Sequence, residues 1–325
     1  MKILVTGASG FLGGRLVPAL IAAGHQVFAL ARSDSAAKAV NALGATPEMG
    51  DLAAPPFDLP ACDAVIHAAA HFRFSGPRKP FERINIEGTR ALLDAARRAG
   101  AQRFIYVSAA ALVMDDKGSP VIGADETAPI YADSFSAYIA TKAAAEKLVR
   151  AANAPGFTTI ALRPPGIWGA GDAFSEALPA MVKRGMFGFI GGGDFANVTC
   201  HVDNVVEAIL LALANGRGGE AYFINDAEPA TMRGFLIDVG HALGLSLEKS
   251  RSLPYGVAMA LGRVMESVAW LTGAKGDPPM TRTMVRLIGR PFTTNDAKAR
   301  AELGYAGKVK RAEGLKAYSQ GPLLS

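Results

Sequence analysis

Residues 2–13, KILVTGASGFLG, decide the fold of this chain. The apolar run at their start is typical of a buried parallel strand, and the segment from Phe11 to Ala23 is predicted to be a helix. Between the two, Gly7 permits a tight turn, Gly10 lets the backbone approach a ligand, and Gly13 lets the helix pack on the strand. The stretch therefore predicts a strand–turn–helix unit whose helix N-terminus is open to an anion.

Strands and helices alternate along the first half of the chain. Further strands are expected at residues 26–31, 64–67, 103–108 and 158–162, with helices at 33–43, 81–99 and 134–152. This alternation predicts an α/β fold with a doubly wound, mostly parallel sheet of the Rossmann type. After Pro164 the loops lengthen and helices dominate. We therefore expect residues 1–165 to form the nucleotide-binding domain and residues 166–325 a smaller, interleaved substrate-binding part.

Composition excludes several classes of protein. The formal net charge is only +5, with the basic residues scattered, so nucleic-acid binding is not expected and an anionic cofactor explains the excess. Two isolated cysteines, Cys62 and Cys200, argue against a disulfide framework and for a reducing, cytoplasmic location. No signal peptide precedes the first strand, and no apolar stretch is long enough to span a membrane. The five histidines lack ligand spacing, so no metal is expected.

The glycine loop, at a strand end and opening a helix, predicts dinucleotide binding through Gly7, Ser9, Gly10, Phe11, Leu12 and Gly13. The end of the second strand then selects the cofactor. A carboxylate there would bind the ribose 2′-hydroxyl of NAD, but the chain has Ala31, followed by Arg32 and Ser33. Because arginine suits a 2′-phosphate, NADP is favoured over NAD. Asp51 and Leu52, after the third strand, are either adenine contacts or an ordinary turn.

Tyr138 and Lys142 form a YxxxK pair in the predicted helix 134–152. Four residues make about one helical turn, so both side chains lie on one face. A free tyrosine titrates near 10, and a neighbouring ammonium is expected to lower that pKa. The pair therefore predicts proton transfer by Tyr138 during hydride transfer, with Lys142 also within reach of the nicotinamide ribose.

Together these motifs resemble the extended short-chain dehydrogenase/reductase superfamily, also called the NAD-dependent epimerase/dehydratase superfamily. The resemblance covers nearly the whole chain and includes TGASGFLG, HAAA, NIEGT, YVS, YIATK, LRPPGIWG and HVDNVVEAI. Within the superfamily, YIATKAAAEKLVRAAN, ALRPPGIWGAGD and GEAYFINDAEPATMRGFL look most like the 3β-hydroxysteroid dehydrogenase branch. That branch also holds sterol-4-carboxylate 3-dehydrogenases and bacterial 2-alkyl-3-oxoalkanoate reductases.

The resemblance implies an oxidoreductase that interconverts a secondary alcohol and a ketone on a small hydrophobic substrate, steroid-like or 3-oxo acyl. It also implies a homodimer that pairs helices 81–99 and 134–152 of two copies. Further cofactor contacts are implied at Ala68, Ala69, Ala70, Asn85, Pro165, Gly166 and Ile167.

One position departs from the family pattern. The segment after the fifth strand normally supplies a Ser or Thr that hydrogen-bonds the substrate oxygen, but here that position is Ala109. Losing one such donor typically costs about 10²–10³ in rate. Ser108, one residue earlier, is expected to point to the other face of the strand. A later hydroxyl or a water replaces the donor, or the chain is catalytically weak or specialised for an unusual substrate.

Several residues carry two interpretations each. His71 and Phe72 line the substrate pocket or pack within their loop, and Trp168 walls the pocket or fills the core. Asp203 is predicted to cap the helix that begins there. The segment from Tyr255 to Gly273 is predicted to be a helix packed on the core; its alternative is a hydrophobic lid that makes peripheral contact with a membrane.

Two rival functions remain open. A nucleotide-sugar epimerase or dehydratase shares the scaffold and needs basic side chains to bind a diphosphate; the candidates are Arg184, Arg251, Arg282, Arg286 and Arg290. A cofactor-binding sensor or scaffold without useful turnover would be consistent with Ala109.

Overall fold

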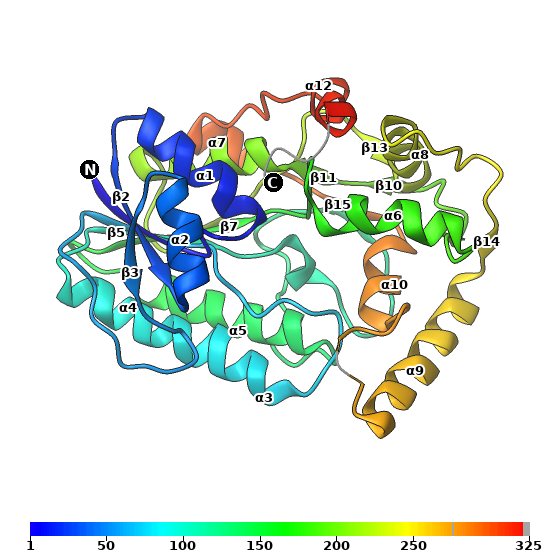
Figure 1. Ribbon diagram of the computed structural model, residues 1–325, viewed down its shortest axis with the longest axis horizontal. Coiled ribbons are helices and arrows are strands. Elements are labelled where there is room, and N and C mark those ends of the chain that lie inside the picture. The colour runs from blue at the N-terminus through cyan, green and yellow to red at the C-terminus, as the bar shows by residue number, and fades with distance from the viewer. Residues whose placement is uncertain (275, 321–325) are drawn as a thin grey trace.

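A single parallel sheet organises the molecule. The computed structural model describes residues 1–274 and 276–320 and shows seven strands in the order β12-β7-β5-β4-β1-β2-β3, all parallel (Figure 1). The strands are β1 (Lys2–Thr6), β2 (Gln26–Ala31), β3 (Thr46–Met49), β4 (Ala64–His67), β5 (Arg103–Val107), β7 (Thr158–Arg163) and β12 (Glu220–Phe223). The predicted α/β fold with a doubly wound parallel sheet is confirmed.

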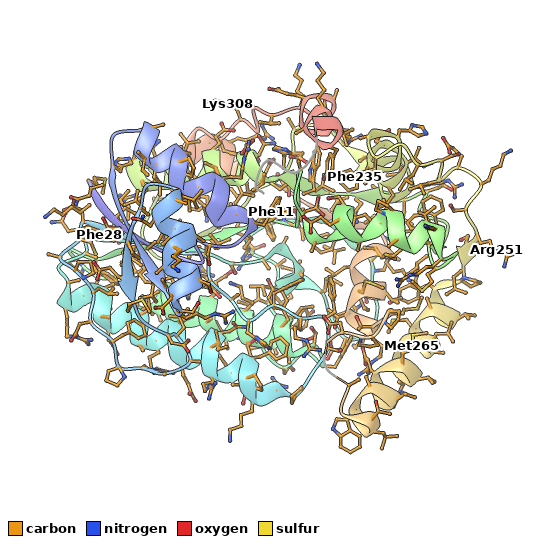
Figure 2. All side chains as sticks on the ribbon, viewed as in Figure 1. Phe11, Phe28, Phe235, Arg251, Met265 and Lys308 are labelled. Atoms are coloured by element: carbon orange, nitrogen blue, oxygen red, sulfur yellow. The ribbon has the colours of Figure 1, made fainter. Side chains whose placement is uncertain are left out.

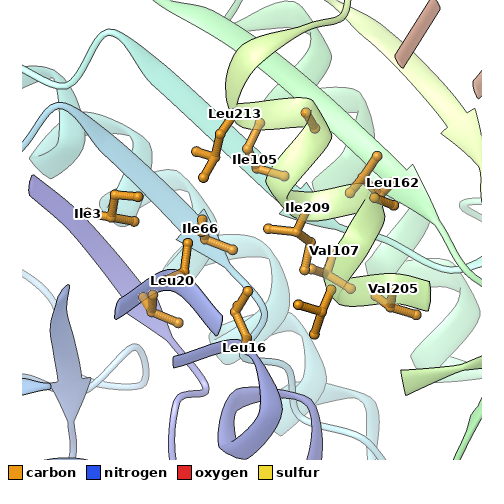
Figure 3. Packing of buried hydrophobic residues seen from close by; sticks show 14 of the residues in the cluster. Ile3, Leu16, Leu20, Ile66, Ile105, Val107, Leu162, Val205, Ile209 and Leu213 are labelled. Atoms are coloured by element: carbon orange, nitrogen blue, oxygen red, sulfur yellow. The ribbon is translucent and has the colours of Figure 1, made fainter. Parts of the chain in front are cut away.

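Helices cover both faces of this sheet (Figure 1). One face carries α1 (Phe11–Ala22), α2 (Asp34–Ala42), α7 (Val202–Ala214) and α11 (Ala297–Leu303); the other carries α3 (Arg78–Phe81), η1 (Glu82–Glu87), α4 (Gly88–Arg98) and α5 (Ala137–Ala151). Side chains alternate between the two faces, so Ile3 packs with Leu16 and Ile209 on the first face while Leu4 packs on the second. Figure 3 shows the first cluster between the strands, α1 and α7.

The second part of the chain is built from short strands and helices. Its elements are β8 (Gly166–Trp168), α6 (Ala173–Lys183), β9 (Phe189–Ile190), β10 (Ala196–Asn197), β11 (Thr199–His201), β13 (Ala230–Thr231), α8 (Met232–Ala242), β14 (Ser252–Leu253), α9 (Tyr255–Thr272), α10 (Arg282–Ile288), β15 (Phe292–Thr294), α12 (Arg311–Lys316) and η3 (Ala317–Gln320). From the first part, η2 (Ala110–Val113) follows β5, and β6 (Val121–Ala124) pairs with β15. Conversely, α7, β12 and α11 return to the main sheet, which interleaves the two parts.

Two predicted helix starts differ from the structure. The expected helix 81–99 begins at Arg78. It contains one π-helical segment, η1, in which each turn holds more residues than an α-helical turn does. The cap predicted for Asp203 is wrong: Nδ1 of His201 accepts the Asp203 N–H at 3.2 Å and caps α7. The Asp203 carboxylate instead binds Arg15 on α1 at 2.6 Å.

Helix α9 is formed as predicted, but its large side chains do not enter the core. Only Ala258 and Gly262 are buried, whereas six large apolar side chains are between 40% and 78% exposed: Val257, Leu261, Val264, Val268, Trp270 and Leu271. The prediction that this helix packs its apolar face on the core is therefore wrong. None of the helices within the described residues is both long and apolar enough to cross a bilayer.

Candidate functional site

The glycine loop joins β1 to α1 at the carboxyl edge of the sheet. Gly7 has φ +75°, and a Cβ atom there would lie 2.8 Å from the amide nitrogen of Ala69. A Cβ at Gly13 would lie 2.3 Å from the carbonyl oxygen of Gly7, so this position also requires glycine for packing. Gly10 is exposed and begins α1 without a side-chain cap, which leaves the first N–H groups of the helix open to a ligand. The loop thus has the shape that a pyrophosphate needs.

The end of β2 contains a cation and no carboxylate. Arg32 is exposed, and the Ser33 hydroxyl caps α2 by accepting the Ala36 N–H at 3.3 Å. Asp51 accepts the N–H of Ala53 at 2.9 Å, so its carboxylate closes the turn after β3.

A chain of hydrogen bonds orders the loop after β4. The hydroxyls of Thr6 and Thr89 bind the two ring nitrogens of His67 at 2.7 and 2.9 Å, and burial lowers the pKa of His67 to about 3, with Lys142 adding to the effect. Thr6 Oγ1 also accepts the Ala69 N–H at 3.2 Å, and Thr89 Oγ1 donates to the Asn85 carbonyl at 2.6 Å. A neutral His67 therefore links the glycine loop to η1.

Asn85 acts within this network. Its Oδ1 accepts the His71 N–H at 2.7 Å, and its Nδ2 donates to the His71 carbonyl at 3.2 Å and to Thr141 Oγ1 at 3.1 Å. Asn85 is buried, so its amide holds the segment Ala68–His71 against α5 and has no free edge for a ligand. The three alanines, Ala68, Ala69 and Ala70, are half-buried beside Gly7, where a cofactor predicted to lie in the loop would pass.

Tyr138 lies on the first turn of α5 beneath an aromatic side chain. The ring of Phe72, which is 55% exposed, meets the Tyr138 ring edge to face at 4.9 Å. His71 packs on Phe81 at 4.6 Å. Phe72 therefore stands between Tyr138 and solvent, whereas His71 anchors the loop.

Lys142 is buried one turn further along α5. Its ammonium donates to the Val107 carbonyl at 2.6 Å and lies 4.0 Å above the ring of Tyr106. Burial lowers the pKa of Lys142 to about 7, and the nearby Glu146 carboxylate opposes that shift. Burial raises the pKa of Tyr138 to about 12, so the predicted lowering by Lys142 is wrong for the protein without ligand. The reason is that burial disfavours the charged phenolate.

The pKa of Lys142 predicts how stability depends on pH. The folded chain releases this proton near pH 7, whereas an unfolded lysine holds it up to about 10.5, so the unfolded state binds more protons between these values. Stability of the wild type should therefore rise with pH relative to Lys142→Met, by about 1.4 kcal/mol per unit between pH 8 and pH 9.5. Urea unfolding of both proteins at three pH values measures this slope. Lys38→Met, at an exposed lysine of α2, should show the wild-type slope; equal slopes for all three would contradict the assignment.

Ala109 lies where the sequence places it, after β5, and has no donor. It is almost fully buried with Ala110 and Ala111 in the apolar cluster that contacts Tyr138. Ser108 is turned away, as predicted: its hydroxyl donates to Glu146 Oε2 at 2.6 Å. No hydroxyl among the described residues is hydrogen-bonded to Tyr138 Oη.

Sequence reasoning missed Glu146 and Arg163. The two are fully buried and joined by three hydrogen bonds, the shortest of them 2.6 Å from Arg163 Nη2 to Glu146 Oε1. Tyr138, Lys142 and Glu146 repeat every four residues on α5, so a YxxxKxxxE pattern was the available signal.

The loop after β7 brings Pro165, Gly166 and Ile167 towards the same edge of the sheet. Gly166 is exposed with open space around it, and Ile167 packs on the core cluster of α1 and α7. Trp168 is only 4% exposed, and its indole N–H donates to Asp226 at 2.7 Å. Its ring packs on His201 at 4.7 Å, so Trp168 belongs to the core of the second part and does not wall an open pocket. Within the described residues, no cluster of His, Cys, Asp or Glu side chains could hold a metal ion.

Comparison with known proteins gives the family. The model of the 3-beta hydroxysteroid dehydrogenase/isomerase family matches residues 4–255. A 4-hydroxy-2-methyl-3-oxo-4-farnesyl-3,4-dihydroquinoline-1-oxide ketoreductase of Stigmatella aurantiaca is 42% identical, over 98% of this chain and 96% of that protein. A 2-alkyl-3-oxoalkanoate reductase of Stenotrophomonas maltophilia is 36% identical, over 97% of this chain and 98% of that protein.

Solved structures agree on the fold. A UDP-glucuronic acid 4-epimerase of Bacillus cereus, solved in complex with NAD, superposes with a TM-score of 0.74. The alignment covers 98% of this chain and 97% of that one at 20% identity, which shows the shared fold alone. With the glycine loop and the Tyr138–Lys142 pair in place on that fold, and with a family model that spans most of the sequence, the chain belongs to the 3-beta hydroxysteroid dehydrogenase/isomerase family.

Proposed function

We propose that this chain is an NADP-dependent oxidoreductase that interconverts a secondary alcohol and a ketone on a hydrophobic, steroid-like or 3-oxo acyl substrate. The observation that carries the proposal is the position of Tyr138 and Lys142, one turn apart on α5, with the Lys142 ammonium at the end of β5, where it donates to the Val107 carbonyl. The names of the two relatives, both reductases of 3-oxo compounds, support the substrate class.

The residues of the site divide the chemistry between them. The nicotinamide of a bound cofactor supplies or takes the hydride. Tyr138 Oη donates a proton to the carbonyl oxygen during reduction and takes it back during oxidation. Phe72 keeps water from the Tyr138 ring, and Lys142 brings an ammonium that can return the proton to Tyr138. The glycine loop, with Arg32 and Ser33 beside it, holds the dinucleotide.

The direct test is nucleotide binding followed by turnover. Purified protein is titrated with NADPH and NADH by fluorescence, and NADPH oxidation is then followed with a long-chain 3-oxo ester and a 3-oxosteroid. We expect tight NADPH binding and oxidation that depends on the ketone. A chain that binds neither nucleotide would contradict the proposal.

Arg32→Ala tests the choice of NADP. A charge-assisted hydrogen bond contributes about 1.5–3 kcal/mol, so its loss should weaken NADPH binding roughly 10–100-fold and leave NADH binding nearly unchanged. Lys38→Ala, at another exposed cation of the same region, is the control. If Arg32→Ala weakens the binding of NADPH and NADH equally, Arg32 does not bind the 2′-phosphate.

A second candidate function follows from Ala109. With Ala109 at the position where the family has a hydroxyl, and with no hydroxyl of the described residues hydrogen-bonded to Tyr138 Oη, the chain would bind NADPH as a sensor or scaffold with weak turnover. Ala109→Ser adds a hydroxyl at this position and is expected to raise ketone reduction by about 10²–10³-fold, the contribution typical of one such donor. NADPH consumption by the two proteins under equal conditions measures the effect. NADPH binding without turnover in either protein would favour the sensor.

The nucleotide-sugar interpretation receives less support. Arg286 is buried against Asp115 at 3.3 Å, Arg282 binds Glu266 at 2.7 Å, and Arg290 lies over the Tyr255 ring at 4.2 Å. Arg251 lies at the outer edge of the molecule (Figure 2). A diphosphate would have to displace existing partners of Arg282, Arg286 and Arg290, whereas a hydrophobic substrate would meet the apolar cluster beside Tyr138.

Location and assembly complete the proposal. Two buried free thiols, Cys62 and Cys200, favour the reducing environment of the cytoplasm. A homodimer formed by η1, α4 and α5 would bring a charged helix face to the partner copy. Exposed side chains of η1 and α4 include Arg83, Glu87 and Arg90, so charge pairs would hold that interface.

A further inference from the structure

Helix α9 presents an ordered row of apolar side chains to solvent. Val257, Leu261, Val264, Val268 and Leu271 follow one another at alternating spacings of four and three residues, which places them on one side of the helix. Trp270 adds the most exposed large side chain, at 78%. The opposite side packs on the chain through Gly262, where a Cβ atom would lie 3.0 Å from the Arg282 nitrogen. Figure 2 shows α9 at the periphery, with its outer side chains projecting away from the rest of the chain.

The same region carries the net charge of the protein. Residues 249–290 contain seven Lys and Arg but only two Asp and Glu, a formal charge of +5. The whole chain has 34 basic and 29 acidic residues, so the remaining residues hold 27 of each and are balanced. On α9 itself, Arg263 is exposed, while Glu266 is neutralised by Arg282 at 2.7 Å. Four of the seven are exposed among the described residues, Lys249, Arg251, Arg263 and Arg290, so exposed cations accompany the apolar row in this part of the chain.

We propose that this surface, the outer side of α9 with its flanking basic residues, docks on a lipid bilayer that carries anionic headgroups. A helix lying in the interface would insert its apolar row, and cationic side chains would contact the headgroups. Trp270, at the last turn of α9, is a residue type enriched at membrane interfaces. A second copy of the chain is the poorer occupant, because the exposed cations Lys249, Arg251, Arg263 and Arg290 of the two copies would repel each other.

Hydrogen bonds connect the segment that follows α9 to the loop at the candidate site. Asp277, five residues beyond the end of α9 at Thr272, accepts the N–H groups of Phe74 at 2.9 Å and Ser75 at 2.8 Å. These residues continue the loop whose Phe72 covers Tyr138. Docking of α9 would therefore bring the mouth of the site to the membrane, where a hydrophobic substrate dissolves; this last step rests on the proposed function, whereas docking does not.

Vesicle co-sedimentation of the full chain, without nucleotide or substrate, tests the docking. The probes are vesicles of phosphatidylcholine alone and of phosphatidylcholine with phosphatidylglycerol. We expect binding to the anionic vesicles that weakens at least severalfold at high salt, and much weaker binding to phosphatidylcholine alone. The double variant Val264→Asp/Val268→Asp should lower the partition coefficient at least tenfold. The matched control, Val264→Leu/Val268→Leu, keeps the row apolar and should bind as the wild type does.

Both positions are more than half exposed, so the variants should fold, and circular dichroism with thermal unfolding verifies this. Wild-type protein that stays in the supernatant with anionic vesicles would overturn the proposal, as would an aspartate pair that binds like the leucine pair. The proposal also fails if the wild-type protein does not bind vesicles and is an oligomer in sedimentation that the aspartate pair dissociates. In that case the outer side of α9 is the interface with a second copy. Because no turnover is measured, either result leaves the oxidoreductase assignment to its own test.

Discussion

Tyr138→Phe is expected to lower ketone reduction by about 10²–10⁴-fold, the contribution typical of a positioned general acid. The substitution removes one hydroxyl and keeps the ring on which Phe72 packs at 4.9 Å. NADPH binding should stay within about twofold of the wild type, since no backbone or loop contact changes. The loss should therefore appear in kcat and not in the dissociation constant of the cofactor.

The matched control is Tyr255→Phe. Its hydroxyl is buried without a hydrogen-bond partner among the described residues and lies in the packed side of α9. That variant should turn over at the wild-type rate. Steady-state NADPH oxidation and fluorescence titration of the three proteins separate chemistry from binding. A Tyr138→Phe protein that retains more than about a tenth of wild-type kcat would remove Tyr138 from the mechanism.

Glu146→Gln should destabilise the fold by about 3–5 kcal/mol, because removing one partner of a buried ion pair leaves the other charge uncompensated. Arg163 is 1% exposed and forms its ion pair with Glu146. One of its guanidinium nitrogens, Nη1, already has no hydrogen-bond partner among the described residues. The amide that replaces the carboxylate can also no longer accept on both oxygens from Arg163 and Ser108.

Glu220→Gln is the control for that experiment. Glu220 pairs with Lys298 at 2.6 Å, but both side chains are partly exposed, so the expected cost is below about 1 kcal/mol. Urea unfolding of the two variants and the wild type gives the comparison. Equal destabilisation by both substitutions would mean that burial of the Glu146–Arg163 pair has no special energetic consequence.

Much of the sheet could be predicted because local patterns determine it. The glycine loop needs its backbone geometry whatever surrounds it, and the confirmed φ of +75° at Gly7 reflects that requirement. The YxxxK spacing similarly fixes Tyr138 and Lys142 on one helix face. The predicted lowering of the Tyr138 pKa is wrong because burial raises that pKa, and burial depends on side chains distant in sequence, such as Phe72, that no local pattern reveals.

Other features depend on contacts that no local pattern reveals. The π-helical segment around Asn85 exists because its amide binds the backbone of His71 and the side chain of Thr141 on a different helix. The apolar side of α9 follows the usual helical spacing, which indicates a buried face only when another element covers it. Here nothing among the described residues does, so periodicity predicted the helix correctly and its partner wrongly.

The return of β12 to the edge of the sheet has a consequence for dissecting this protein. Glu220–Phe223 pairs with β7. Helix α7 contributes Val205 and Ile209 to the hydrophobic cluster on the face of the sheet that α1 also covers. A fragment ending near residue 165 would expose the hydrogen-bonding edge of β7. It would also lack α7 and α11, which cover one face of the sheet together with α1 and α2. The nucleotide half is consequently not an autonomous module, and chimeras that exchange substrate specificity would have to graft loops between these elements instead of joining halves.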